Sequence, residues 1–278
     1  MGIEIKQLSK ILLLLLLTHT LHAIDLEIKV GTGLFYTGAQ GYIEYTDVGF
    51  EGSYSDIDLK NSGQFYFWSD IKAQIDYLPI FRFQYLKIHT DGDSKLHLQG
   101  SDVPAEFQEI LDIFNDKRWE SGLSQNIYDL YLYYEFYEEQ AHPSIGVGGG
   151  LKIFDYGYNV ELILPLQVGD RGGKVVPMIF LTTRYEIPSV QLGFEVESEV
   201  YVFGSSTLYD TRAKMDLLID IDKSTKAGFE IGYRDSYYDL RGDESYKANM
   251  HYKGLYVGVM TTFKKLTLLN RPLSFQKV

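Results

Sequence analysis

A strict alternation of apolar and charged residues over positions 190–221 constrains the fold of this chain more than any other feature. In residues 190–202 the apolar side chains share one face, and in the next segment the pattern repeats. A period of two predicts strands, because a helix brings apolar residues together three and four positions apart. The charged face of the two strands carries Glu195, Glu197, Glu199, Arg212, Lys214 and Asp216. Such a strand fits a wall between lipid and a polar interior.

The same alternation recurs along the chain and predicts about ten strands. They cover residues 25–35, 65–75, 81–90, 127–137, 144–154, 175–185, 190–202, 210–221, 227–237 and 246–263. An N-terminal apolar run, residues 11–17, is too short for a membrane helix, and no other stretch reaches eighteen apolar residues, which leaves a closed barrel as the membrane option. We therefore predict an all-β, transmembrane, up-and-down antiparallel β-barrel. In the fifth strand, Gly146, Gly148 and Gly150 are expected on the lumen side, where they make room for bulky neighbours.

The N-terminus predicts export. Lys6 and Lys10 precede the aliphatic run, and polar residues and Ala23 follow it. This order is typical of a secretory signal peptide, so we expect cleavage near Ala23. The predicted organisation is a signal peptide (1–23), an outer-membrane barrel (24–263) and a periplasmic tail (264–278).

The connections between the predicted strands fall into two classes. Those at residues 77–80, 139–143, 186–189 and 222–225 are short and lie at the end of the barrel that holds the termini. The opposite end is expected to carry long loops at 38–64, 91–126 and 155–174, the asymmetry of short periplasmic turns and long external loops. Asp102 and the spacing of apolar residues predict one short helix, residues 103–114, in the second loop.

The last strand carries a pattern typical of the closing strand that the barrel-assembly machinery reads. Its polar residue, glycine, alternating apolar residues and final aromatic residue are Tyr252, Gly254, Val257, Val259 and Phe263. Fifteen residues follow Phe263 here, whereas the signal usually ends the chain.

The chain resembles a family of outer-membrane β-barrel proteins of epsilon-class proteobacteria, most of which are described by location only. The stretches that carry the resemblance are residues 41–45 (GYIEY), 77–85 (YLPIFRFQY), 176–180 (VPMIF), 204–210 (GSSTLYD) and 228–263. The resemblance implies a barrel in the outer membrane of a Gram-negative cell, and it supplies no catalytic residues.

Charges of both signs are predicted to fill the lumen. Besides the six above, the charge network includes Lys152, Arg184, Glu230 and Arg234. If Ser205 and Ser206 form a two-residue hairpin, Glu199 faces Arg212 and Glu197 faces Lys214. Paired charges suit a narrow, plugged barrel, because each buried charge needs a partner. We therefore predict a structural or surface-interaction role, and keep a narrow, passive, cation-favouring pore lined by the glutamates as the alternative.

Enzyme, cofactor and metal functions are not predicted. The chain has no cysteine, which excludes thiolate sites and disulfides. At the external mouth, His89, His97, Asp91, Asp93 and Asp243 are candidates for acid–base catalysis of the kind that outer-membrane proteases use, and solvated loop positions explain them equally well. The motif from Asp91 to Ser94 offers only two carboxylates to a calcium ion.

The expected partners follow from the location. They are outer-membrane lipid and lipopolysaccharide, and the barrel-assembly machinery during insertion. A net charge of −12 argues against nucleic acid. The triplet Arg241, Gly242 and Asp243 matches a short integrin-binding motif, although a turn explains it without function. The extracellular ligand and the oligomeric state stay open at this point.

Overall fold

The computed structural model describes residues 25–47, 50–73, 75, 77–99, 115, 117–137, 143–161, 167–203, 206–241 and 246–267. The predicted signal peptide, the predicted loop helix, Asp243 and the tail after Thr267 lie outside these residues. Across the described ranges, no helix has the length and apolar character needed to cross a membrane.

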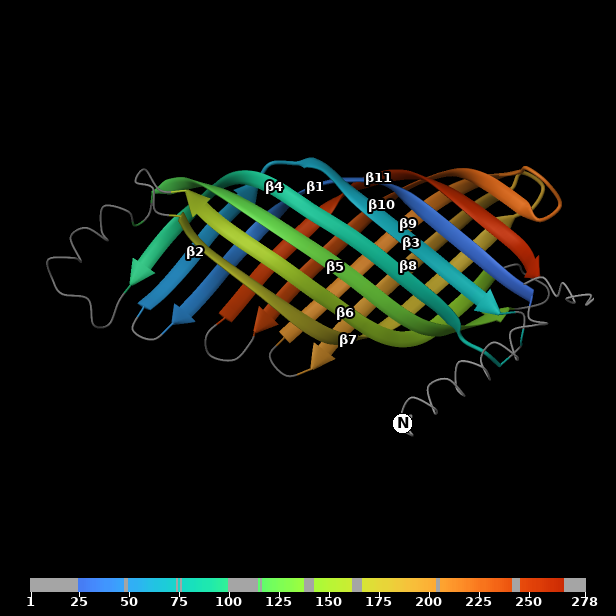
Figure 1. The fold of residues 1–278 in the computed structure, drawn as a ribbon, viewed down its shortest axis with the longest axis horizontal. Helices are drawn as coiled ribbons and strands as arrows, with labels where there is room; N and C mark the ends of the chain where they lie inside the picture. Colours follow the sequence, from blue (N-terminus) through green and yellow to red (C-terminus); the bar gives the residue numbers. More distant parts are fainter. Residues whose placement is uncertain are drawn as a thin grey trace, which may run out of the picture.

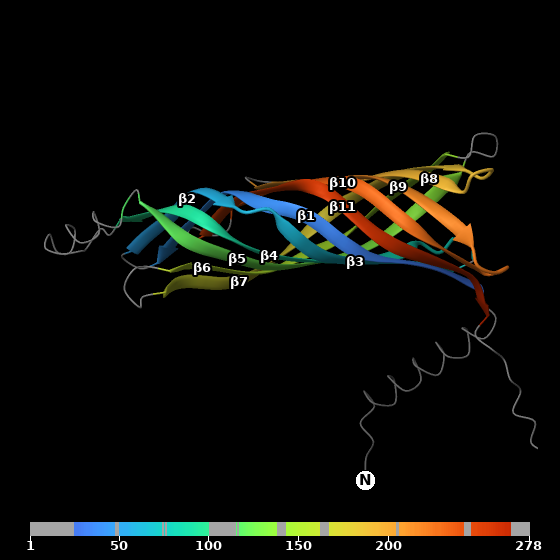
Figure 2. The ribbon, with the colours of Figure 1, turned by 90° about the horizontal axis from the view of Figure 1, so that it is seen from above.

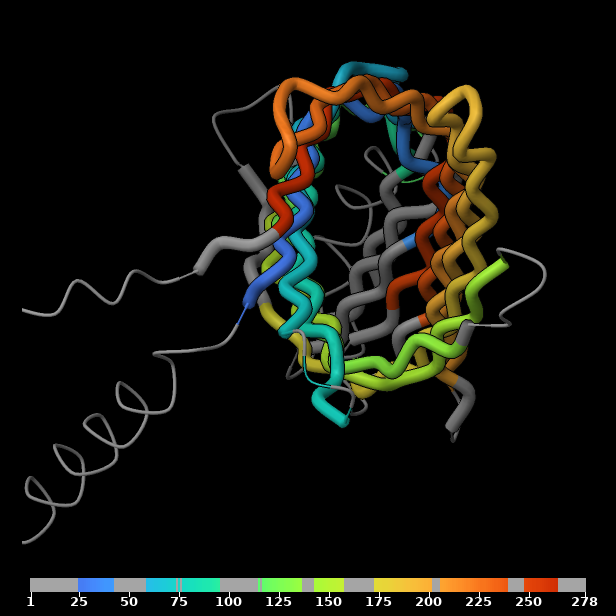
Figure 3. The backbone as a smooth tube through the Cα atoms, turned by 90° about the vertical axis from the view of Figure 1, so that its right-hand side faces the viewer, coloured from blue at the N-terminus to red at the C-terminus, as the bar shows by residue number. Residues whose placement is uncertain are grey.

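The described residues form one antiparallel sheet that closes on itself (Figures 1 and 3). The strands are β1 (Asp25–Asp47), β2 (Phe50–Leu59), β3 (Ser62–Ala73), β4 (Ile80–Gln99), β5 (Arg118–Tyr137), β6 (Pro143–Glu161), β7 (Gln167–Ile187), β8 (Leu192–Phe203), β9 (Ser206–Asp220), β10 (Thr225–Arg241) and β11 (Tyr246–Thr267). Neighbours along the chain pair with each other, except β2 and β3, and β11 pairs with β1 from Asp25 opposite Thr267 to Tyr45 opposite Tyr246. Closure removes both sheet edges, which is what a lipid environment requires.

The eleven strands occupy ten positions in the wall. Both β2 and β3 pair with β1 on one side and β4 on the other, so together they form one crossing that is interrupted at Lys60 and Asn61. The prediction of a ten-strand antiparallel barrel is therefore confirmed, with one broken strand that the sequence pattern did not reveal.

Short turns gather at the end where β1 begins and β11 finishes. The backbone N–H of Val190 donates to Ile187 O, and the N–H of Asp222 donates to Thr225 O. The predicted turn at 139–143 lies almost wholly outside the described residues. Termini and short turns face the periplasm in barrels of this kind, so we name this the periplasmic end and the opposite end the external end.

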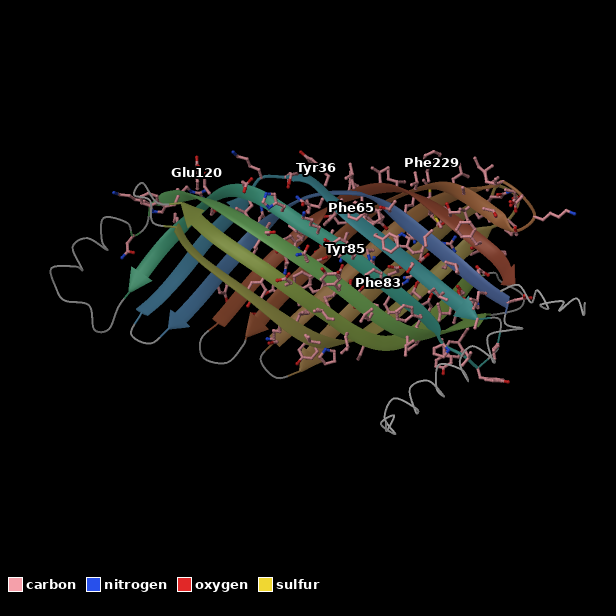
Figure 4. The ribbon with its side chains drawn as sticks, in the orientation of Figure 1. Tyr36, Phe65, Phe83, Tyr85, Glu120 and Phe229 are labelled. Atoms are coloured by element: carbon pink, nitrogen blue, oxygen red, sulfur yellow. The ribbon has the colours of Figure 1, made fainter. Side chains whose placement is uncertain are left out.

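An apolar belt surrounds the wall. Its exposed side chains include Leu34, Tyr36, Phe65, Leu132, Phe136, Ile145, Ile179, Phe194, Leu217, Phe229 and Val257, and in Figure 4 Tyr36, Phe65 and Phe229 lie along the outer surface. On β7 the belt runs from Val175 to Tyr185, ten residues apart. That spacing is roughly 33 Å along a strand and roughly 25 Å after a tilt of about 40°, the height of a membrane-spanning apolar band.

Beyond the belt, strands continue where long loops were predicted. β1 reaches Asp47, and β4 continues from Leu86 to Gln99 past the last outward aromatic residue, Tyr85. β6 and β7 leave only residues 162–166 between them. The predicted loops at 38–64 and 155–174 are thus largely strand, and strand also covers 91–99 and 118–126 of the loop predicted at 91–126. The taller side of the wall stands at the external end, at the left of Figures 1 and 2.

The physical reason is an inversion of polarity along the strands. Within the belt, β5 points Leu130 and Leu132 outward and Asp129 inward. Above the belt, it points Ser124 and Glu120 outward and Leu123 and Ile127 inward, where both are buried. Lipid surrounds the lower part and water the upper part, so the apolar residues change face while the strand continues.

Candidate functional site

The interior of the barrel has two zones that differ in chemistry. Within the belt it is filled by a network of charged side chains, which we call the charged layer. At the external side most of the large buried side chains are apolar, with small polar side chains and glutamines between them, and we call this zone the apolar cap. The structure places all ten residues of the predicted charge network in the charged layer. Asp70, Arg82, Asp129 and Asp210 also belong to it, joined through ion pairs.

Arg82 on β4 is the centre of the first cluster. Its guanidinium bonds both oxygens of Asp70, with Nε–Oδ1 and Nη2–Oδ2 distances of 2.5 and 2.6 Å. It also reaches across the lumen to Glu197 and Glu195 on β8. The rings of Trp68, Tyr133 and Phe180 lie 5.3 to 5.7 Å from its central carbon. Arginine suits this place because its planar fork binds two carboxylates while its faces contact aromatic rings.

Lys152 on β6 is the centre of the second cluster, and its side chain is completely buried. Its Nζ lies 2.8 Å from Asp129, 2.6 Å from Glu199 and 3.1 Å from Asp210. These three carboxylates offer oxygens within 4.8 Å of one another, as metal ligands do. The ammonium group stands among them and supplies the positive charge that a metal ion would otherwise bring.

Asp210 connects this cluster to the external side. It accepts from Arg234 through Nε at 2.9 Å and through Nη2, from Ser236 at 2.8 Å and from Tyr238 at 3.2 Å. Near the periplasmic end Arg184 bonds both oxygens of Asp216, at 2.7 and 2.8 Å, and one of Glu195 at 2.8 Å. The clusters therefore share carboxylates and form one continuous network.

The register between β8 and β9 differs from the prediction. Glu197 is opposite Arg212 and Glu195 is opposite Lys214, because Phe203 pairs with Ser206. Each residue of β8 is thus opposite a β9 residue two positions away from the one that a hairpin at Ser205 and Ser206 would give it. A shift of two residues keeps every side chain on its face of the sheet. The charged residues of both strands therefore face the lumen as predicted, although their partners differ. Glu199 still reaches Arg212 diagonally at 3.1 Å.

Aromatic donors complete the network, and sequence reasoning missed them. Tyr66 Oη and Trp68 Nε1 both donate to Glu230, at 2.7 and 2.9 Å, and Tyr131 Oη donates to Glu199 at 2.8 Å. The signal that was available is their position, since Tyr66 and Trp68 share the inward face of β3 with Asp70, and Tyr131 shares that of β5 with Asp129.

The charged layer is rich in negative charge. Six basic residues, Arg82, Lys152, Arg184, Arg212, Lys214 and Arg234, contact eight carboxylates, which are Asp70, Asp129, Glu195, Glu197, Glu199, Asp210, Asp216 and Glu230. Several basic groups contact two or three carboxylates each, which is how fewer cations hold more anions.

The apolar cap lies at the external side of the lumen. Its buried members include Leu59, Leu86, Ile88, Trp119, Leu123, Ile127, Ala248 and Met250. At the level of the charged layer, the expected glycines make room for aromatic rings. A Cβ on Gly146 would lie 3.0 Å from Tyr133 Cδ2, and one on Gly150 would lie 2.5 Å from Tyr131 Cδ1. At Gly148 a Cβ would meet the neighbouring strand itself, 2.5 Å from both Cα and Cβ of Tyr133.

Two cavities inside the charged layer have volumes of about 40 and 20 Å³. The larger one lies toward the periplasmic end, beside Lys29, Lys72 and Arg184. The smaller lies between Trp68, Glu230 and Arg234. A single water needs roughly 10–15 Å³, so each cavity is of water size.

The closing-strand residues lie on β11, which continues to Thr267, four residues past Phe263. Val257 and Val259 face outward in the belt, whereas Tyr252 is buried inside and donates to Gln125 Oε1 at 2.8 Å.

The candidate catalytic residues His89, Asp91 and Asp93 occupy successive outward positions on β4 and are exposed. The side chain of His97 and the whole of Asp243 lie outside the described residues, as do the side chain of Arg241 and residue Gly242.

A closed wall of ten strands, an apolar belt of membrane height and a lumen filled with paired charges define a small outer-membrane β-barrel. No protein-family model and no curated protein matches the sequence.

Among solved structures, the chain is similar to the outer membrane protease OmpT from Escherichia coli, with a TM-score of 0.46, 9% identity and coverage of 86% of this chain and 96% of that chain. It is also similar to Neisserial surface protein A (0.32, 12%, 84% and 95%) and to the attachment invasion locus protein Ail of Yersinia pestis (0.27, 11%, 86% and 99%). At these identities and TM-scores, no activity, ligand or residue role passes from those proteins to this one.

Proposed function

We propose that this chain is a non-conducting, non-enzymatic outer-membrane barrel that acts through the wall it presents outside the membrane, in a structural or surface-interaction role. The observation that carries the proposal is the filled interior. Side chains of the charged layer cross the lumen from β4 to β8 through Arg82 and Glu197, and Lys152 joins β5, β6, β8 and β9. The buried side chains of the apolar cap lie beyond this layer, at the external side.

The same contacts argue against the pore alternative. A cation-selective path needs carboxylates that face water. Here Glu195, Glu197 and Glu199 are buried and each contacts at least two basic side chains. These carboxylates are engaged by basic groups within the network and do not face a water path.

Conductance in planar bilayers tests the closed lumen. We expect no steady current from the parent protein or from a Glu197→Gln variant, with insertion of both verified by heat-modifiable migration in gels. A steady cation-selective current through the parent that falls in Glu197→Gln would refute the proposal.

Site-directed labelling tests the orientation of the wall. Because the chain has no cysteine, a single introduced cysteine reports one position without background. Glu120, exposed near the external end in Figure 4, is the first position, and Lys223 in a periplasmic turn is the matched control. A membrane-impermeant maleimide should label Glu120→Cys in intact cells and Lys223→Cys only after lysis. Labelling in the reverse order would mean that the taller side of the wall faces the periplasm.

A further inference from the structure

The interruption between β2 and β3 leaves a depression on the outer surface of the barrel. Its volume is about 370 Å³, and its lining includes Gly38, Gln40, Lys60, Asn61, His251 and Lys253. These residues come from three neighbouring places in the wall. Gly38 and Gln40 of β1 pair with Lys253 and His251 of β11, and Lys60 and Asn61 form the break beside them. We call this depression the rim site.

The rim site lies at the external boundary of the apolar belt. The next outward pair of residues toward the periplasm is Tyr36 opposite Leu255, whose side chains are 59% and 61% exposed. Tyr36 marks this level in Figure 4. Tyrosine is enriched at the boundary between hydrocarbon and headgroups. A pocket directly above such a pair faces the headgroups of the outer leaflet.

The rim site is positively charged. Lys60 and Lys253 are exposed, and within the described residues no hydrogen bond or ion pair engages either ammonium group. Asp235 is opposite Lys253 in the register, but its carboxylate is bound by His251 Nε2 at 2.7 Å and by Tyr209 Oη at 3.4 Å. Lys60 also lines a neighbouring depression on β4 and β5, together with Asp91, Asp93 and Glu120. Lys60 and Lys253 are the two lysines in the lining of the rim site, and the lining, as far as the structure describes it, includes no carboxylate.

The break itself builds the floor of the site. A Cβ on Gly38 would lie 2.8 Å from Asn61 Oδ1 and even closer to Leu59 O. The absence of a side chain at Gly38 thus lets Asn61 lie across the neighbouring strand. Two ammonium groups and two amide side chains then surround a space larger than a phosphate group, in reach of a lipid whose chains lie along the belt.

We propose that the rim site binds a phosphate group on the headgroup of an outer-leaflet glycolipid. Ammonium groups near an anionic membrane surface attract phosphate, and amide N–H groups donate to its oxygens. The position directly above Tyr36 and Leu255 selects a membrane lipid over a soluble anion, because only a lipid can also contact the belt below. The site is on the outer wall, so it does not depend on whether the lumen conducts.

Native mass spectrometry of the full barrel in detergent micelles tests the proposal with diphosphorylated lipid A as the probe. The variant is Lys60→Gln with Lys253→Gln. The matched control, Lys223→Gln with Lys226→Gln, removes the same charge at the periplasmic end. Near the membrane each lysine contributes about fivefold to binding of an anionic headgroup, so the rim double variant should bind roughly thirtyfold more weakly. The control should bind as the parent does.

Two further probes separate the sources of phosphate. Dephosphorylated lipid A should bind weakly to the parent and be insensitive to the variants, and inorganic phosphate equimolar with the lipid should not displace diphosphorylated lipid A. Equal affinity of parent and rim variant, equal binding of the dephosphorylated lipid, or displacement by inorganic phosphate would each overturn the proposal. If the double variant fails to fold, the two single variants carry the test, each with an expected fivefold loss.

Discussion

Substituting Lys152 by methionine separates an electrostatic role of the charged layer from simple space filling. Methionine keeps a side chain of similar length and removes the ammonium group, which contacts Asp129, Glu199 and Asp210 at 2.6 to 3.1 Å. Glu199 retains Arg212 and Tyr131, and Asp210 retains Arg234. Lys152 is the one described basic side chain in contact with Asp129, so the substitution leaves that buried carboxylate without a cation.

The size of the effect follows from the loss of the basic partner of Asp129. Removing one partner of a buried ion pair costs about 3–5 kcal/mol, since the remaining charge stays desolvated and uncompensated. We expect Lys152→Met to lower the free energy of unfolding by that amount. Adding Asp129→Asn removes the stranded charge and should restore most of the loss, a coupling that a double-mutant cycle measures.

Equilibrium unfolding in urea, followed by tryptophan fluorescence in lipid vesicles, is the assay. The chain has two tryptophans, and both Trp68 and Trp119 are buried inside the barrel, so their emission reports loss of the interior. The matched control is Lys72→Met at the periplasmic rim. Its side chain is 33% exposed and its pair with Glu135 spans 3.0 Å, so about 0–1 kcal/mol is expected. If the free energy of unfolding of Lys152→Met lies within about 1 kcal/mol of that of the parent, the buried network does not contribute the stability assigned to it.

Three other predictions test the wall and its turns. Gly148→Ala should destabilise by about 1–3 kcal/mol because its Cβ meets Tyr133, whereas Gly149→Ala on the outward face should be tolerated, as urea midpoints will show. Val257→Arg in the belt should lower the free energy of unfolding in vesicles by about 2–4 kcal/mol, and Ser124→Arg above the belt by roughly 0.5 kcal/mol or less. Equal losses would contradict the position assigned to the belt. Ser224 donates its backbone N–H and hydroxyl to Asp222 at 2.7 and 2.8 Å, which lowers the pKa of that carboxyl. A lowered pKa stabilises the fold above the ordinary carboxyl pKa and loses this effect as the pH falls through the folded value. Asp222→Ala should therefore reduce stability at pH 7 and leave it unchanged in strong acid, and a loss that persists in acid would contradict this.

The strands within the belt could be predicted from the sequence because lipid imposes a rule that each residue obeys. The faces of β8 and β9 follow directly from it, as Phe194 and Met215 point outward and Glu195 and Lys214 inward. The extensions above the belt obey the opposite rule. Leu86 and Ile88 of β4 alternate with Lys87 and His89, a period of two as clear as that within the belt. These extensions were predicted as loops because only segments with apolar residues outward and polar residues inward were interpreted as strands.

The partners within the charged layer could not be predicted because they depend on contacts across the lumen. Arg82 meets Glu197, 115 positions away, from the opposite side of the barrel. Local hairpin geometry carries no information on such a pair. It also gave a β8–β9 register that differs by two residues from the observed one. Sequence therefore indicated which residues face inward, while the closed wall determines which of them touch.

These cross-lumen contacts also bear on how the barrel becomes stable. Arg82 is held by Asp70 from the neighbouring β3 and by Glu197 from β8, and Lys152 gathers carboxylates from β5, β8 and β9. Until β8 and β9 face β4 to β6, each of these charges would have to stay hydrated, since burying one without its partners is costly. The network thus forms only as the wall closes, and it adds its stability to the closed state alone. A lumen of this kind favours a single cooperative closure over a partly open barrel, which is consistent with a wall whose function lies on its outer surface.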